Sequence, residues 1–203
     1  MATFTYSSGS RPSSNSVVFP LNKITRVGLN IVSLPPNAIG FTYVLCGGGG
    51  GGGNGGSLCG GGGAAAGETV TATVLIAELL AALSLTRIQA TMTVTISGAV
   101  YPNQRGGPST LAIGASTLEI AQGGYGGLVG SPYQGWGPWV GGTTYTSAGG
   151  MGQVSQLNGT RVVPELGLPP IVPIATYGNG GNGGSVGAGG SVGHSGYCSI
   201  QFF

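Results

Sequence analysis

Charged side chains are scarce in this sequence. Its 203 residues contain no aspartate, four glutamates, one histidine and six lysines or arginines. The lack of aspartate excludes a Ser/His/Asp triad built from one chain, and no motif supports a Ser/His/Glu version. No Gly-Lys-Ser/Thr follows any glycine run, so a phosphate-binding loop is also missing. We therefore expect a protein that is not an enzyme and uses no cofactor, with His194 as a surface side chain.

Basic runs, long apolar runs and a leader sequence are also lacking. The six cationic residues are dispersed and cannot neutralise a row of phosphates, so we expect no nucleic-acid partner. The longest apolar stretch, residues 74–85, is too short to span a bilayer and contains Glu78, so we expect no membrane insertion. Residues 1–20 are polar and serine-rich without an apolar core, which favours synthesis in a cytosol.

Cysteines are few and odd in number: Cys46, Cys59 and Cys198. An odd count argues against a closed disulfide framework, and small buried thiols in the reduced state are the simpler interpretation. Whether any two of them pair stays open at this point. One histidine and three scattered cysteines are a poor set of metal ligands, so we expect no metal site.

Glycine is the residue type in excess, at 45 of 203 positions, which is about three times the usual ~7%. Because an ordered glycine loses more backbone entropy than any other residue, ordered glycine tracts need compensation. The excess is periodic, with glycine at every third residue in three separate tracts. The periodic positions are Gly47, Gly50, Gly53 and Gly56, then Gly124, Gly127 and Gly130, and finally Gly178, Gly181, Gly184, Gly187, Gly190, Gly193 and Gly196.

A period of three matches neither the 3.6-residue period of a helix nor the two-residue period of a strand. A left-handed polyproline-II-type helix has three residues per turn, so its glycines form one bare edge against which another backbone packs closely. Such a helix has no internal hydrogen bonds, and its N–H and C=O groups need partners in neighbouring segments. We therefore predict a small bundle of glycine helices. The alternative is that the tracts are flexible linkers.

Alternating apolar and polar residues predict short strands between and beside the glycine tracts. We predict strands at residues 23–31, 41–46, 69–75, 88–96 and 196–203, one strand or two short ones at 111–120, a loop at 101–108, and an Asn158-Gly159 hairpin at 154–163. Residues 77–85 contain good helix formers and favour two turns of helix, with no helix as an equal alternative. The predicted fold class is all-β and sandwich-like, with short antiparallel strands and packed glycine segments. Residues 1–40 would form an N-terminal docking arm and the first strand, and residues 41–203 a glycine-rich β domain.

The remaining signal is a group of aromatic residues in a stretch rich in glycine and proline, and it includes both tryptophans. The five residues are Tyr125, Tyr133, Trp136, Trp139 and Tyr145. Flat rings with a polar edge suit stacking on sugars or on protein surfaces, so these five residues are our candidate receptor-binding residues. The alternative is that the rings only cover glycine tracts in place of a side-chain core.

Two stretches carry a resemblance to a known group of proteins. Residues 43–46 (YVLC) lead into the first glycine run, and residues 196–203 (GYCSIQFF) close the chain after the last one. Together with the glycine blocks they resemble the glycine-rich domain of tailed-bacteriophage tail-fibre and other virion proteins, over residues 41–203. The resemblance implies a virion component, assembled in the host cytoplasm and often a homotrimer. It further implies loops at an exposed end that in some members bind the bacterial surface.

Two functions follow from the resemblance and compete. The first is a tail-fibre or adhesin component that contributes to host attachment through a host surface glycan or outer-surface protein. The second is a purely structural capsid decoration or cement protein, or a neck or baseplate protein, with no receptor. In both, the N-terminal arm would dock on other virion proteins. An ice-binding or wall-type glycine-rich protein is a third interpretation, but it needs secretion.

Overall fold

The computed structural model describes residues 19–57, 60–130 and 177–203. Within these ranges the chain forms eight short strands and one helix. In chain order they are β1 (Asn22–Ile24), β2 (Gly28–Val32), β3 (Gly40–Cys46), β4 (Thr69–Leu75), α1 (Ile76–Ala82), β5 (Met92–Ile96), β6 (Ser109–Ile113), β7 (Ser116–Ala121) and β8 (Tyr197–Phe202). Residues 1–18 of the predicted N-terminal arm and the predicted hairpin at 154–163 lie outside the described residues.

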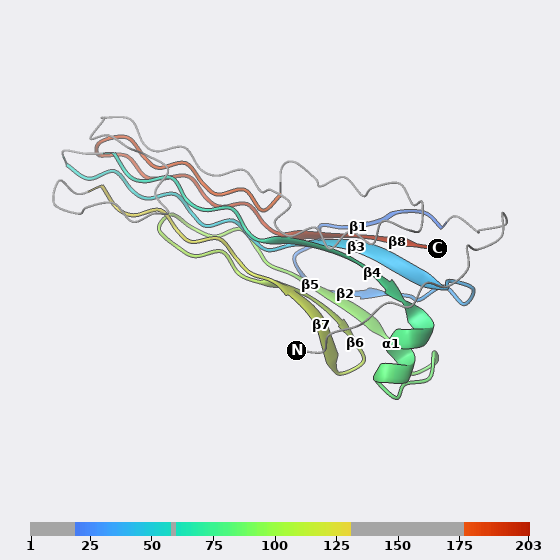
Figure 1. Ribbon diagram of the computed structural model, residues 1–203. Helices are drawn as coiled ribbons and strands as arrows, with labels where there is room; N and C mark the ends of the chain where they lie inside the picture. The colour runs from blue at the N-terminus through green and yellow to red at the C-terminus, as the bar shows by residue number, and fades with distance from the viewer. Residues whose placement is uncertain (1–18, 58–59, 131–176) are drawn as a thin grey trace.

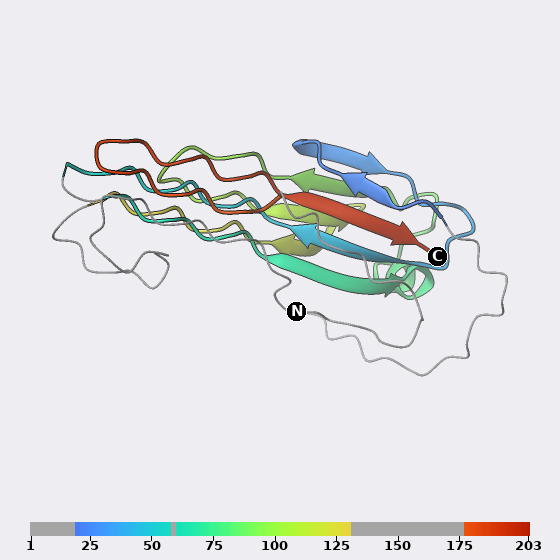
Figure 2. The ribbon, with the colours of Figure 1, turned by 90° about the horizontal axis from the view of Figure 1, so that it is seen from above.

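The strands form two four-stranded sheets in which every neighbouring pair is antiparallel. Sheet A has the order β1-β8-β3-β4 and sheet B the order β2-β5-β6-β7. The two sheets face each other as two layers, and α1 closes the end of the sandwich away from the glycine tracts (Figures 1 and 2). The expectation of an all-β fold of short antiparallel strands is confirmed.

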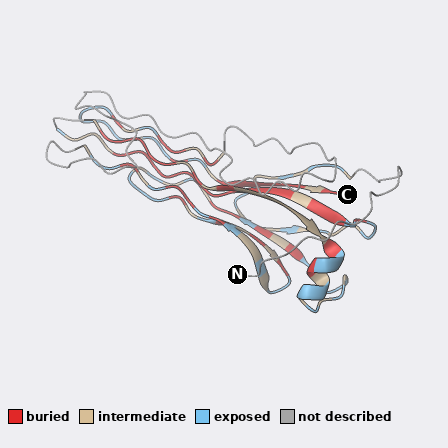
Figure 3. Ribbon diagram, viewed as in Figure 1, coloured by how far each residue is buried: buried red, intermediate tan, exposed pale blue. Residues whose placement is uncertain are grey.

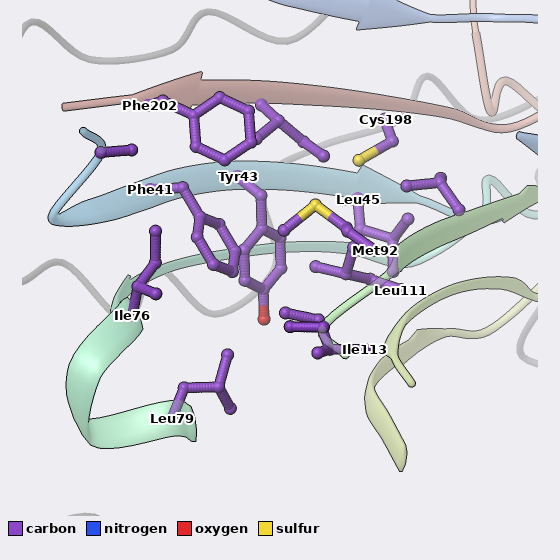
Figure 4. Packing of buried hydrophobic residues seen from close by; sticks show 14 of the residues in the cluster. Phe41, Tyr43, Leu45, Ile76, Leu79, Met92, Leu111, Ile113, Cys198 and Phe202 are labelled. Carbon is purple, nitrogen blue, oxygen red and sulfur yellow. The ribbon is translucent and has the colours of Figure 1, made fainter. Parts of the chain in front are cut away.

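The hydrophobic core lies between the sheets and follows the two-residue period of the strands. From β3, Phe41, Tyr43 and Leu45 point into it; β5 and β6 contribute every second residue from the opposite layer (Figure 4). In β5, Met92, Val94 and Ile96 are buried while the intervening threonines are not. In β4 and β5 threonines alternate with apolar residues, so the sequence of these strands specifies which face turns inward.

Two of the predicted strands differ in the structure. The stretch at 23–31 is not one strand but two: β1 pairs with β8 in sheet A, and β2 pairs with β5 in sheet B. Gly28, with φ of +94°, opens β2 and allows the chain to change layers. The strand predicted from residue 88 begins only at Met92, because the N–H of Gln89 bonds back to the carbonyl of Thr86 in a turn.

The other predicted elements agree more closely. β4 covers the predicted residues 69–75, and residues 111–120 form the two short strands β6 and β7, joined at Gly114 with φ of +58°. A helix forms where one was favoured, at Ile76–Ala82, and it buries Ile76 and Leu79 against the core. Ser84, with φ of 53°, ends the turn that follows the helix.

Cys46 and Cys198 are both buried, and the strand register keeps the two thiols apart from each other. Cys198 is opposite Leu45, and Cys46 is opposite Tyr197. Cys198 therefore lies in the core between the sheets, whereas Cys46 lies on the other face of sheet A with Val44 and Tyr197. The expectation of reduced, buried thiols is confirmed for these two residues. Burial raises the pKa of the Cys198 thiol far above its ordinary value.

Candidate functional site: the glycine bundle

The glycine tracts continue beyond one end of the sandwich as extended legs that lie side by side (Figures 1 and 2). β3, β5 and β7 each run outward into a leg, and a returning leg enters each of β4, β6 and β8. In the part of the chain that the structure describes, the legs are residues 47–56, 60–67, 98–101, 104–107, 122–130, 178–186 and 188–196, with no helix and no strand of the two sheets in any of them. We call 47–56 the central leg and the others the outer legs.

The amides of the central leg point to three neighbours in rotation. Gly47, Gly50 and Gly53 donate their N–H groups to leg 60–67 and the residue after it, with N···O distances of 2.9, 3.0 and 2.8 Å to Glu68, Ala65 and Gly62. The next residue in each triplet donates to leg 104–107: Gly48 to Gly107 at 3.0 Å and Gly51 to Gln104 at 2.9 Å. The third donates to leg 188–196: Gly49, Gly52 and Gly55 to His194, Ser191 and Ala188 at 2.9, 2.9 and 2.8 Å. The donor pattern therefore has a period of three.

The carbonyls of the central leg accept from the remaining outer legs with the same period. Gly48, Gly51 and Asn54 accept from Gly124, Gly127 and Gly130 at 2.9, 2.8 and 2.8 Å. Gly50, Gly53 and Gly56 accept from Gly181, Gly184 and Gly187 at 2.8, 2.8 and 3.0 Å. Gly52 accepts from Asn103, just beyond leg 98–101, at 3.0 Å. All six outer legs thus contact the central leg, which donates to the returning legs and accepts from the outgoing ones.

Backbone hydrogen bonds also join most of the outer legs to one another in sequence around the centre. Leg 60–67 bonds to 122–130 (Ala65 N–H to Tyr125 C=O, 2.9 Å), and 104–107 bonds to 122–130 (Gly106 to Gly124, 2.8 Å). The turn from Tyr101 to Gln104 joins 98–101 to 104–107, and Val100 pairs with Gly193 of 188–196. The remaining bonds are Gly178 to Ser195 at 2.8 Å and Gly61 to Gly184 at 2.7 Å. The ring is closed, and residues 47–53 of the central leg are buried within it, whereas residues 54–56 are partly exposed (Figure 3).

This enclosure explains why residues 47–53 are an unbroken run of glycine. A Cβ atom on Gly47, Gly50 or Gly53 would overlap a carbonyl oxygen of leg 122–130. On Gly49 and Gly52 it would overlap a carbonyl of leg 178–186, and on Gly51 the carbonyl of Tyr101. At six of the seven positions a backbone carbonyl thus fills the direction in which a side chain would point, whereas at Gly48 a Cβ atom would lie 2.8 Å from Ser97 Oγ.

The outer legs need glycine only on the faces that they turn to other legs. In 122–130 the pairs Gly123-Gly124 and Gly126-Gly127 face inward, while Gln122, Tyr125 and Leu128 face solvent. Leg 178–186 repeats this arrangement. In leg 188–196, Gly190 and Gly193 face the central leg and Gly196 faces Cys46, the residue before it. In each leg, the number of glycines per three residues therefore matches the number of its three faces that other legs cover.

The structure places the predicted glycines in three ways. A side chain is excluded by backbone contact at Gly47, Gly50, Gly53, Gly181, Gly184, Gly190, Gly193 and Gly196. Gly178 and Gly187 have φ of +71° and +70°, and Gly56 accepts a hydrogen bond. Sequence reasoning missed the glycines between these positions, such as Gly49, Gly52 and Gly180, for which the unbroken run was the available signal. It also interpreted residues 101–108 as a loop, although 104–107 is one of the six outer legs.

Of the five candidate receptor-binding residues, only Tyr125 lies within the described residues. Its side chain is 48% exposed, and the Arg105 guanidinium carbon lies 4.6 Å from the centre of its ring. Tyr133, Trp136, Trp139 and Tyr145 lie in residues 131–176, outside the described residues. His194 is exposed on leg 188–196, and its Nδ1 lies 3.3 Å from the carbonyl oxygen of Asn179.

The described residues hold no group of three or more His, Cys, Asp or Glu side chains that could bind a metal ion. Across 19–57, 60–130 and 177–203, no helix has the length and apolar character needed to cross a membrane. No protein-family model matches the chain, and no curated protein matches it at a significant level.

Proposed function

We propose that the legs are polyproline-II-type helices with three residues per turn. The three-residue period of the donors and acceptors supports this conformation, and so does the lack of hydrogen bonds within the central leg. At about 3.1 Å per residue, a ten-residue leg extends about 31 Å. Circular dichroism, backbone carbon chemical shifts and amide exchange of the folded protein test the proposal. Legs with strand shifts, or with amides that exchange as fast as those of an unfolded chain, would contradict it.

We further propose that the chain is a non-enzymatic virion protein of a tailed bacteriophage, a tail-fibre or adhesin component that contributes to host attachment. The resemblance of residues 41–203 to such domains supplies the class. The observation that carries the proposal is the closed ring of legs around residues 47–56, which gives the molecule a sandwich at one end and chain reversals at the other (Figure 1). A bundle held by backbone hydrogen bonds is a rigid mount for the segments that emerge from its far end.

The direction of leg 122–130 connects the mount to the aromatic residues. This leg runs away from the sandwich, parallel to the central leg, so the chain enters residue 131 at the far end of the bundle. Tyr133, Trp136, Trp139 and Tyr145 follow in the sequence. We propose that these rings contact a host surface glycan or outer-surface protein, with Tyr125 on the side of the bundle as a further contact.

Binding of the purified, fluorescently labelled protein to bacteria that adsorb the phage tests the adhesin. We expect the protein to bind these cells and to block phage adsorption, and Trp136→Ala with Trp139→Ala to abolish both effects. The matched control is Val192→Ala, which changes an exposed residue on the side of the bundle and leaves binding unchanged. A folded protein that neither binds cells nor blocks adsorption would contradict the proposal.

The purely structural decoration, cement, neck or baseplate protein remains the second candidate. The exposed aliphatic residues Val27, Leu29 and Ile31 favour it, because such a strip suits contact with another protein. Antibody-labelled electron microscopy of virions separates the two candidates. Label at the distal fibre tip would contradict the purely structural role, and label on the head or neck would contradict the adhesin.

We propose a homotrimer from the resemblance alone. Sedimentation equilibrium tests the oligomeric state, and its result does not bear on the bundle.

A further inference from the structure

The open side of the sandwich, opposite α1 and β4, contains a groove that the bundle does not involve. Its volume is about 470 Å³, and it lies where the chain crosses from β1 in sheet A to β2 in sheet B. Its lining comes from residues 22–26, which include Lys23 and Arg26, and from residues 30–33, which include Asn30 and Ile31. The groove is therefore bordered almost entirely by two strands and their connection.

Both of these strands are edge strands. Among the described residues β1 pairs only with β8, and β2 pairs only with β5, so each presents one edge of unpaired backbone groups. Free edges are the sites at which an extended peptide adds to a sheet through main-chain hydrogen bonds. The Asn30 amide holds the β1–β2 connection in place by donating to the carbonyls of Arg26 at 2.8 Å and Gly28 at 2.9 Å. The edges are thus presented on a fixed frame.

The charge at the groove is positive and unpaired. Lys23 and Arg26 are exposed, and neither side chain makes a hydrogen bond or ion pair within the described part of the chain. The other two described cations are engaged: Arg87 bonds to the carbonyls of Pro36 and Ala38, and Arg105 lies over Tyr125. Beside the cations, Ile31 is 72% exposed on the groove wall.

We propose that this groove binds an extended acidic segment of another protein, which adds as a strand to the free edge of β1 or β2. Its carboxylates pair with Lys23 and Arg26, and an apolar side chain packs on Ile31. The proposal needs only the geometry of this side of the sandwich and does not depend on the function proposed above. The partner segment is defined by its chemistry, as an extended backbone with alternating acidic and β-branched side chains.

The charges of this chain argue against its own segments as the occupant. Residues 131–176 contain one acidic side chain, Glu165, and one cation, Arg161, so they have no alternation of acidic residues. Residues 1–18 contain no acidic side chain and add a cation, Arg11. Of the described glutamates, Glu68 accepts from the N–H of Gln122, Glu119 accepts from Tyr43, and Glu78 lies on helix α1. A second copy therefore offers no described extended acidic strand to the groove, and a partner of different sequence fits better.

Fluorescence anisotropy with the full chain and a labelled nine-residue peptide of alternating valine and glutamate tests the proposal. We expect saturable binding that weakens as salt is added. A peptide with lysine in place of glutamate should bind at least about 10-fold more weakly, because it places like charges together. N-methylation of alternate backbone amides should cost a similar factor, because it removes the main-chain donors while keeping the charges.

Variants of the protein localise the site. Lys23→Gln with Arg26→Gln should weaken binding at least about 10-fold, whereas Leu128→Glu with Val192→Glu, which changes the net charge by the same amount elsewhere, should leave it within about 2-fold. Absence of binding, equal binding of the lysine peptide, or equal binding of the N-methylated peptide to the unaltered protein would each overturn the proposal. These three outcomes do not depend on whether any variant folds.

Discussion

Gly50 donates its N–H to the carbonyl of Ala65 at 3.0 Å, although the two residues lie on legs that run in opposite directions. The carbonyl of Tyr125, on the leg next to that of Ala65, occupies the place where a side chain of Gly50 would begin. One residue is thus held by a hydrogen bond to one leg and by close backbone packing against another. The same arrangement recurs three residues away at Gly47 and Gly53.

This packing predicts a large difference between two glycine-to-alanine changes. Gly50→Ala should lower the free energy of unfolding by about 3 kcal/mol or more, because the new methyl group overlaps backbone that cannot move without breaking hydrogen bonds. Gly189→Ala is the matched control: its Cβ would meet only Asn54 Oδ1, at 3.7 Å, so stability should stay equal or rise by up to about 1 kcal/mol. Urea unfolding measures both. Similar losses for the two variants would contradict the enclosed central leg.

Three consecutive alanines test the hydrogen-bond period with the same chemistry at each position. Ala64 donates to Gly181 and Ala65 to Tyr125, both at 2.9 Å, whereas the N–H of Ala66 has no hydrogen-bond partner among the described residues. Amide exchange of Ala64 and Ala65 should be at least about 100-fold slower than that of Ala66. Uniform protection would indicate a helix, and uniformly fast exchange a flexible linker; either would contradict the bundle.

Asn103 lies at the turn between legs 98–101 and 104–107, with φ of 64°. Its Oδ1 accepts the N–H of Asn54 at 2.9 Å. Asn103→Ala should cost about 2 kcal/mol or more, since it loses this hydrogen bond and strains a left-handed backbone. Asn103→Gly should cost only about 1 kcal/mol, because glycine keeps the backbone conformation. Thermal unfolding of the pair checks the order, and a glycine variant as unstable as the alanine variant would show that backbone strain is not a factor.

The buried thiol of Cys198 predicts a loss of stability at alkaline pH. Burial raises its pKa in the folded state, so the thiol stays neutral there while the unfolded chain ionises above about pH 8.5. The contribution is present below that pH and falls by up to about 1.4 kcal/mol per pH unit above it. Between pH 7 and 10, the stability difference between the unaltered protein and Cys198→Ala should shrink by about 2 kcal/mol. A difference that does not change with pH would contradict the prediction.

Much of the strand pattern could be predicted from the sequence, because period-two alternation is a local signal. Residues 69–75 were predicted as a strand and form β4 to the residue. The change of layer between β1 and β2 could not be read from residues 23–31, because their apolar pattern continues through Gly28 while the two strands pair in different sheets. The pairing partner of a strand is a property of the whole fold.

The glycine bundle, too, could be predicted from the sequence only in part. The period of three at residues 178–196 predicted the packed edges, and the structure shows backbone contact at most of those glycines. The role of 104–107 was missed because Gly106 and Gly107 lie beside Gln104 and Arg105, without a repeat long enough to show a period. Of the aromatic candidates, Tyr125 is exposed on the bundle beside Arg105, and the other four stay a prediction.

The sequence by itself determined that the glycine legs have to pack against other backbone, because a leg without internal hydrogen bonds or side chains has no other way to stabilise itself. The tertiary structure decided which leg lies at the centre. In sheet A, β3 lies between β8 and β4, so residues 47–56 leave the sandwich between legs 188–196 and 60–67. Sheet B supplies the legs that continue β5, β6 and β7. Strand order is set by long-range pairing, and only that pairing places residues 47–53 where, at every position except Gly48, a side chain would meet the backbone of another leg.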